Sequence, residues 1–335
     1  MTSTTATPVA AHELLHWGKQ HTDSALRTAV GVLPERMRRV AEYHLGWADA
    51  DGSPHAELYG GRALRPTLAL LCAQAVGGHT EDAVPAAVAV ELVHNFALLH
   101  EDVMDQDHTR RQRPAAWAVF GRPDAILAGN TLLALAFRAL AGGGRTGRPD
   151  ALARLTDCVA ALCEGQSADL AFEHRTLVGV AENLTMVANR TGSLLGTACA
   201  LGALAGGADP VRVRALHEFG AHLGLAYRLA GDVAALAGTG QDLVRGKKSL
   251  PVLLALGSGT PAGLALAEYY ARPGTLGPAD APAMTALLTG CGAGARARRQ
   301  AAEHLARAVD CLEHAGCEPV PVHALLALAD LVVRG

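Results

Sequence analysis

Long apolar segments are the feature that most constrains how this chain can fold. Several stretches carry apolar residues at helical spacing or almost without interruption, and the alternation typical of a half-buried β-strand appears nowhere. A helix that is apolar around most of its circumference must be covered by neighbouring helices. The sequence therefore predicts an all-α bundle of roughly ten or more helices. The stretches that carry this signal are residues 86–100, 124–141, 152–172, 184–205, 211–235 and 249–256.

Short turns rich in glycine and proline separate these stretches. They lie at residues 141–150, 204–210 and 273–282, and none has the composition of an interdomain linker. Hydrophobic residues make up 50% of the chain, which excludes disorder on a large scale. We therefore expect a single domain over residues 1–335, with residues 1–20 fraying or lying across its surface.

Charge and cysteine usage exclude several classes of protein. The formal net charge is -3 and no long basic run is present, so a broad surface for nucleic acid is not predicted. The seven cysteines are scattered and never form a CxxC pair, which argues against a disulfide framework or a zinc site and favours the reducing cytoplasm. No stretch reaches about 18 uninterrupted apolar residues, so we expect no stable membrane insertion.

The stretch ELVHNFALLHEDVMDQDHTRRQR, residues 91–113, carries the most chemistry. A nearly apolar helix runs into a cluster of acids and then into arginines. On a helix, Glu101 and Asp105 lie one turn apart and face the same way, with Cβ atoms about 5 to 6 Å apart. Magnesium binds through a few carboxylates together with water and substrate phosphates, so acids beside arginines suit a magnesium and phosphate site. A solvated acidic turn followed by a basic one fits the spacing equally well.

A second candidate site is the sequence GGRALRP at residues 60–66. Paired glycines let a ligand approach the backbone closely, and Arg62 and Arg65 share a helical face from which both guanidinium groups could bind phosphate oxygens. An arginine pair at the start of a helix is, however, more often simply solvated. The spacing alone leaves both interpretations open.

With these two stretches in place, the sequence resembles the trans-isoprenyl diphosphate synthases, the polyprenyl synthetase family. The resemblance covers roughly residues 30–330 and includes DAILAGNTLLALA, EGQSADLAFE, NRTGSLLGTA and QDLVRGKKSLPVLLAL in the same order. It implies a helical bundle of the isoprenoid (terpenoid) synthase type around a deep central cavity, usually as a homodimer. It also implies magnesium ions that hold an allylic isoprenoid diphosphate while its carbocation is attacked by isopentenyl diphosphate.

The resemblance assigns roles to individual positions. It implies metal ligands at Glu101, Asp102, Asp105, Asp169 and Asp232. Catalytic contacts with the allylic diphosphate and the reacting carbons are implied for Arg110, Arg190, Thr191, Gln166 and Lys247. Substrate-binding positions are implied at Arg62, Arg65, His94, Arg111, Phe96 and Lys248. Phe96, which lies shortly before the first acidic motif, points to a product of farnesyl to geranylgeranyl length.

Two departures from the family pattern concern the metal site. The first acidic motif begins with Glu101, where the family has aspartate. The second motif normally consists of two aspartates, two spacers and a third aspartate, but here Gly231 and Ala235 flank the single acid Asp232. The complete set of magnesium ions is therefore in doubt. Either magnesium binds more weakly, or water or Asp242 makes good part of the loss.

Three functions remain open from the sequence. The first is a divergent prenyltransferase, which the retained Arg62, Arg65, His94 and Arg111 favour because an enzyme that uses one diphosphate does not need them. The second is a terpene cyclase derived from such a synthase, which the altered second motif favours. The third is a weakly active subunit that pairs with an active synthase.

Overall fold

The structure is a computed structural model that describes residues 11–55, 61, 63–175, 177–236, 241–272 and 276–334. The chain forms two compact units, and each is assembled from three segments. Unit 1 consists of Met1–Val159, Thr197–His217 and Leu312–Leu328, and unit 2 consists of Ala160–Gly196, Glu218–Cys311 and Ala329–Gly335. The expectation of one domain over residues 1–335 stays a prediction.

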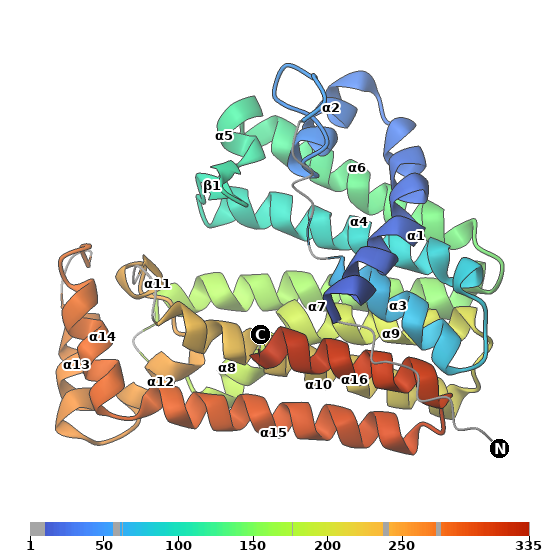
Figure 1. Cartoon of the computed structure of the whole chain (residues 1–335). Coiled ribbons are helices and arrows are strands. Elements are labelled where there is room, and N and C mark those ends of the chain that lie inside the picture. The colour runs from blue at the N-terminus through green and yellow to red at the C-terminus, as the bar shows by residue number, and fades with distance from the viewer. Residues whose placement is uncertain are drawn as a thin grey trace. The chain divides into compact units, whose positions relative to one another are not determined.

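Helices make up almost all of the described secondary structure (Figure 1). In chain order the α-helices are α1 (Ala11–Gly31), α2 (Glu35–His44), α3 (Leu64–Ala75), α4 (Thr80–Met104), α5 (Ala116–Phe120), α6 (Arg122–Ala141), α7 (Pro149–Glu173), α8 (Val180–Val187), α9 (Ser193–Ala205), α10 (Pro210–Ala235), α11 (Gln241–Val244), α12 (Leu250–Leu256), α13 (Pro261–Ala271), α14 (Ala281–Gly290), α15 (Ala293–His314) and α16 (Pro319–Arg334). A 3₁₀ turn, η1 (Arg145–Gly147), a π-helical turn, η2 (Ala188–Gly192), and the short strands β1 (Thr109–Arg110) and β2 (Arg113–Pro114) complete the set.

The predicted helices are confirmed, with three differences. Strands β1 and β2 form a small antiparallel hairpin. The sequence did not predict it, because each strand is only two residues long and too short to show an alternating pattern. Helix α4 begins at Thr80, earlier than predicted, and contains Pro85. Residues 1–20 were expected to fray or to lie across the surface, but residues 11–20 form the first half of α1 and bury Leu14 and Leu15. Residues 1–10 lie outside the described residues.

The core of unit 1 is built from small side chains on α3, α4 and α9. Its buried cluster consists of Ala69, Leu70, Ala73, Ala83, Ala87 and Ala205. Alanine and glycine let the helices approach closely: a Cβ added at Gly202 on α9 would collide with the backbone carbonyl of Ala69 on α3. Helix α4 also packs along α6 (Figure 1). This packing fixes the end of α4, where the predicted acidic motif lies.

Helices α4 and α6 are long and apolar enough to cross a membrane by length and composition alone. Within the fold, however, 61% of the apolar window of α4 and 39% of that of α6 are buried. The apolar character of α4 is thus explained largely by its place in the core of unit 1. The expectation that the chain does not insert into a membrane remains a prediction.

Unit 2 holds its functional helices against two buried clusters. Leu229 and Val233 of α10 pack with Leu250 of α12 and with Ala297 and Ala301 of α15. A second cluster joins α7, α8 and α10 through Phe172, Met186, Val187 and Leu225. These contacts hold the second half of α10, which carries the altered acidic motif, beside α7 and α12.

Candidate active site

The acidic end of α4 contains one deeply buried carboxylate. Asp102 is only 1% exposed, and Arg110 donates to its Oδ1 from Nε at 2.8 Å and also from Nη2. The other carboxylate oxygen, Oδ2, is buried and has no hydrogen-bond partner among the described residues. Burial raises the pKa of Asp102, the charge of Arg110 lowers it, and the charges of Asp107 and Glu101 raise it. A cation at Oδ2 would relieve this desolvated charge.

Glu101 and Asp105 flank Asp102 as predicted. Helix α4 ends at Met104, and Asp105 forms its C-cap with a backbone N–H that donates to the Glu101 carbonyl at 2.8 Å. Glu101 and Asp105 are therefore one helical turn apart, and both side chains are half-buried. Within the described residues no group of three or more His, Cys, Asp or Glu side chains is arranged to hold a metal ion by itself. The acidic end of α4 therefore fits a cation that takes most of its ligands from water and phosphate.

A strained hairpin presents the arginines that follow. Arg110 pairs with Arg113 across β1 and β2, and the two turn residues Arg111 and Gln112 have φ angles of 51° and 63°. This left-handed conformation is uncommon for residues other than glycine and must be held by surrounding contacts. The contacts that hold it come from Arg113 and from Tyr43 of α2.

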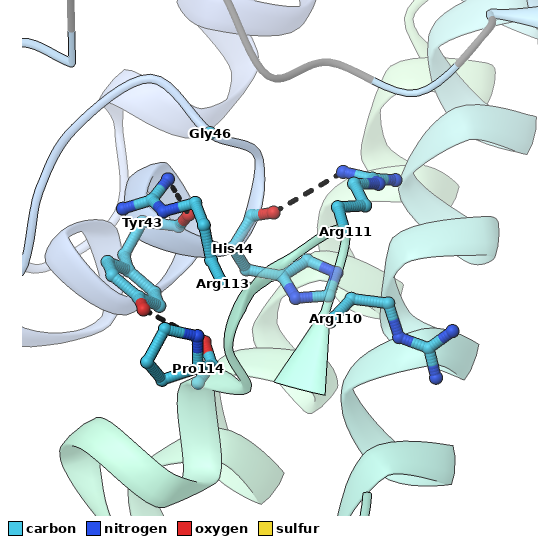
Figure 2. Close-up of a pocket in the computed structure, with 8 residues that line it drawn as sticks. Tyr43, His44, Gly46, Arg110, Arg111, Arg113 and Pro114 are labelled. Atoms are coloured by element: carbon cyan, nitrogen blue, oxygen red, sulfur yellow. Dashed lines mark hydrogen bonds between the residues drawn. The ribbon is translucent and has the colours of Figure 1, made fainter. Parts of the chain in front are cut away.

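Arg113 anchors the hairpin (Figure 2). Its Nη2 donates to the Ala48 carbonyl and to Asp49 Oδ1, both at 3.1 Å, and its guanidinium lies 4.3 Å from the centre of the Tyr43 ring. The Tyr43 hydroxyl in turn donates to the Pro114 carbonyl at 2.8 Å. These contacts leave the side chains of the other two arginines pointing away from Arg113 (Figure 2).

Arg111 lies in a cationic pocket with the buried His44, and the half-buried His94 interacts electrostatically with both residues. It donates from Nη1 to the His44 carbonyl at 3.4 Å. Burial, together with the charges of Arg111 and Arg110, lowers the pKa of His44 to about 3. Burial also lowers the pKa of His94, as do the nearby charges of Arg65 and Arg111. Both imidazoles are therefore neutral at neutral pH, and the positive charge of the pocket resides on its arginines.

These residues form the unit 1 cluster: Asp102, Arg110, Arg111, Arg65, His94 and His44. The clustering places the predicted substrate-binding residues Arg65, His94 and Arg111 in one electrostatic neighbourhood. Arg62 was predicted to act with them but lies outside the described residues. Phe96 is buried on α4, with its ring edge-on to His100 at 4.7 Å between ring centres.

A separate set of charges lies in unit 2. Asp169 of α7 accepts a hydrogen bond from Arg190, and the Lys247 Nζ lies 3.9 Å from its Oδ2. Gln166 is buried one turn before Asp169 on the same helix. The structure thus brings together four of the predicted residues, although they are up to 81 positions apart in sequence, from Gln166 to Lys247.

Two glycines position the turn that carries Arg190 and Thr191. This turn is the π-helical η2, a form that is often found at functional sites. A Cβ added at Gly165 on α7 would lie 2.9 Å from the Arg190 nitrogen, and one added at Gly224 on α10 would lie 2.9 Å from the Thr191 carbonyl oxygen. The backbones of α7 and α10 therefore both touch η2, which only glycine permits at these points.

Asp232 on α10 is paired within its own helix. Its side chain is almost fully buried, and the Arg228 Nε, one turn earlier, lies 2.9 Å from its Oδ1. Burial raises the pKa of Asp232, the charge of Arg228 lowers it, and the charges of Asp242 and Asp169 raise it. We call Asp169, Arg190, Lys247, Arg228, Asp232 and Asp242 the unit 2 cluster. Both Asp102 and Asp232 have an arginine partner, but α10 offers a single carboxylate, whereas Glu101 and Asp105 accompany Asp102 on α4.

Lys248 does not join this cluster. Its side chain is 5% exposed, its Nζ donates to the Gly246 carbonyl at 2.9 Å, and it lies 4.6 Å from the centre of the Tyr270 ring. Its backbone carbonyl accepts from Asn183 Nδ2 at 2.9 Å. These contacts tie α8, α12 and α13 together. A role for Lys248 in substrate binding stays a prediction.

Two residues of these clusters, His44 and Arg228, and the hairpin anchor Arg113 were not assigned a role from the sequence. His44 is the last residue of α2, a helix rich in charged residues, and belongs to no recognisable motif. Arg113 was noted as one of a basic run, but its anchoring role depends on Tyr43 and Asp49, which are far away in sequence. Arg228 had a usable signal: it lies four residues before Asp232, the spacing of an ion pair within one helix.

Comparison with known proteins agrees with this fold. The polyprenyl synthetase family model matches residues 53–280. Geranylgeranyl diphosphate synthase of Mycobacterium tuberculosis is 39% identical over 96% of this chain and 93% of its own length, and (2E,6E)-farnesyl diphosphate synthase of Mycobacterium bovis is 37% identical over 96% and 91%. The crystal structure of a polyprenyl synthetase from Streptomyces coelicolor A3(2) superposes with a TM-score of 0.89 at 39% identity, covering 96% of this chain and 99% of that one.

This chain therefore belongs to the polyprenyl synthetase family of prenyltransferases, the trans-isoprenyl diphosphate synthases. The predicted all-α isoprenoid synthase fold is confirmed by these structural relatives. Divalent metal use is a property of the family, and the acidic end of α4 fits it.

Proposed function

We propose that this chain joins isopentenyl diphosphate to an allylic isoprenoid diphosphate and releases inorganic diphosphate. The allylic carbon–oxygen bond breaks with its electron pair passing to diphosphate. The double bond of isopentenyl diphosphate then attacks the carbocation, and loss of a proton restores a double bond. The relatives named as geranylgeranyl and farnesyl diphosphate synthases support a product of that length, as does the bulky Phe96.

The clustering of Arg65, His94 and Arg111 is the observation that carries this proposal. Isopentenyl diphosphate keeps its diphosphate throughout the reaction and needs a cationic pocket of its own. Neutral His94 and His44 can donate hydrogen bonds without adding charge, while Arg65 and Arg111 provide it. Gly61 leaves room for this arrangement, since a Cβ there would lie 3.1 Å from the Arg111 Nη2.

The acidic end of α4 is assigned to magnesium, and the unit 2 cluster, taken by itself, is assigned to the allylic diphosphate. Glu101, Asp102 and Asp105 would hold magnesium, which supplies positive charge to the departing diphosphate. Arg110 keeps Asp102 oriented and adds a cation beside it. Arg190 and Lys247 would stabilise the negative charge that develops as the bond breaks, and Gln166, Asp169 and Thr191 would orient them.

We also propose a homodimer that works in the cytoplasm without membrane insertion. Support for association comes from α6, where two adjacent large apolar residues are exposed, Ile126 at 40% and Leu127 at 51%. Support for a reducing compartment comes from the free thiols, of which Cys72, Cys158 and Cys199 are buried.

Product analysis tests the proposed reaction. The purified chain is incubated with magnesium and geranyl, farnesyl or geranylgeranyl diphosphate, with and without isopentenyl diphosphate, and products are identified by mass spectrometry. A longer diphosphate formed only with isopentenyl diphosphate is expected. A hydrocarbon or terpene alcohol formed without it would identify a cyclase instead, and no product in any mixture would favour a partner subunit.

A further inference from the structure

The second half of α10 does not fit a metal ion. Asp232 is the single carboxylate there, because Gly231 and Ala235 offer no ligand, and its Oδ1 already accepts from Arg228 at 2.9 Å. A divalent cation on α10 would have to displace this guanidinium or share one buried carboxylate with it. Magnesium is dehydrated reluctantly, and it favours neither arrangement.

We propose that Arg228 binds the diphosphate of the allylic substrate directly, in the place that a metal ion on α10 would otherwise fill. This inference rests on the proposed function, since it names a contact for the same substrate. Asp232 then acts as a positioning residue that holds the guanidinium, and it is not a metal ligand.

The exposure of the two partners supports this assignment. The Arg228 side chain is 43% exposed, whereas that of Asp232 is 7% exposed. The ion pair therefore turns its cationic partner toward solvent and keeps its anionic partner in the protein. A guanidinium presents several donors in a planar fork, which suits two phosphate oxygens at once.

The charge balance of the unit 2 cluster points the same way. Asp169 and Asp242 both act electrostatically on Asp232, so the three carboxylates share one neighbourhood. Three cations accompany them, because Arg190 and Lys247 contact Asp169 and Arg228 contacts Asp232. This balanced cluster suits an anion that competes with the carboxylates for the same donors.

Calorimetric titration with inorganic diphosphate in the presence of EDTA tests the proposal on the full chain. Arg228→Gln is expected to weaken binding about tenfold or more, because a charge-assisted hydrogen bond is lost. Asp232→Asn is expected to bind as tightly as the wild type or more tightly, because a competing carboxylate is removed. Arg214→Gln, an exposed arginine on the same helix, serves as the control and is expected to change binding less than twofold, roughly.

The double variant separates direct contact from charge neutralisation. If Arg228 contacts diphosphate, Arg228→Gln/Asp232→Asn binds about tenfold or more weakly than Asp232→Asn alone. Equal binding by these two variants would overturn the proposal. This pair leaves no buried charge unpaired, so it remains informative even if Arg228→Gln alone fails to fold. Failure of the proposed function would be seen separately, as a wild-type chain that yields no product.

Discussion

The acidic end of α4 and the second half of α10 derive from the same kind of motif but differ in how their carboxylates are satisfied. Asp102 on α4 keeps one buried oxygen without a hydrogen-bond partner among the described residues, and two further acids flank it. Asp232 on α10 has no flanking acid and is held by Arg228. The number of acidic residues therefore does not by itself locate a metal site. Whether the carboxylate oxygens already have hydrogen-bond or ion-pair partners determines whether they can bind a metal ion.

The largest expected effect comes from Asp102→Asn. It removes the charge that would hold a metal ion and leaves Arg110 with the more distant Asp107, 3.7 Å away, so kcat/KM is expected to fall by about 100-fold or more. The matched variant on α10, Asp232→Asn, is expected to lose less than about tenfold, since its carboxylate is not a ligand. Steady-state kinetics at several magnesium concentrations measure both. Equal losses of kcat/KM in the two variants would contradict the proposed difference between α4 and α10.

Gly165→Ala tests whether unit 2 depends on close backbone packing. The new Cβ would lie 2.9 Å from both the Arg190 nitrogen and the Asn189 Cβ, so α7 and η2 must move apart. Such overpacking costs about 1 to 3 kcal/mol of the free energy of unfolding. Displacement of Arg190 from Asp169 is also expected to lower kcat by about tenfold to 100-fold. Chemical denaturation and kinetics check the two effects, and an unchanged kcat would show that η2 does not position Arg190 for the reaction.

The unit 1 cluster is expected to be the more acid-sensitive of the two, because it contains a deeply buried neutral histidine. The pKa of His44 falls from 6.5 to about 3 on folding, through burial and the charges of Arg111 and Arg110. Below pH 6.5 the unfolded chain therefore binds a proton at His44, whereas the folded chain does not bind that proton until the pH falls to about 3. The contribution of neutral His44 to the free energy of unfolding is therefore fully present above pH 6.5. It is lost as the pH falls, by about 2 kcal/mol at pH 5.

His44→Gln should remove that part of the pH dependence. Denaturation at pH 7 and pH 5 measures it, with the exposed His108→Gln as a control that keeps the wild-type slope. A His44→Gln variant as acid-sensitive as the wild type would show that His44 is not the group responsible.

The smallest expected effect comes from Gly231→Ala on α10. A Cβ there would meet no atom within 4 Å, and the position is exposed. Replacing a helical glycine by alanine should raise the free energy of unfolding by about 0.5 to 1 kcal/mol. Comparison of this variant with Gly165→Ala tests whether the two positions differ: Gly165 is needed because neighbouring backbone leaves no room for a Cβ, whereas Gly231 is not needed for that reason. A loss of stability would mean that the end of α10 needs glycine at this position.

The fold could be predicted from the sequence because apolar periodicity is local and strong in segments such as those of α4 and α10. Most residues of both clusters were also predictable, since the resemblance rests on motifs, but His44 and Arg228 were not. The burial and the contacts of the cluster residues were not predictable. The burial of Asp102 and the turning of Lys248 onto Tyr270 depend on helices distant in sequence, and the hairpin that carries Arg111 is too short to show a strand pattern.

Counting bound metal ions tests the central contrast most directly. Manganese is titrated into the wild type, Asp102→Asn and Asp232→Asn in the presence of inorganic diphosphate, and bound ions are counted by electron paramagnetic resonance. If α4 holds the metal and α10 does not, Asp102→Asn binds fewer ions than the wild type and Asp232→Asn binds the same number. Loss of an ion from Asp232→Asn, with Asp102→Asn unchanged, would contradict the account.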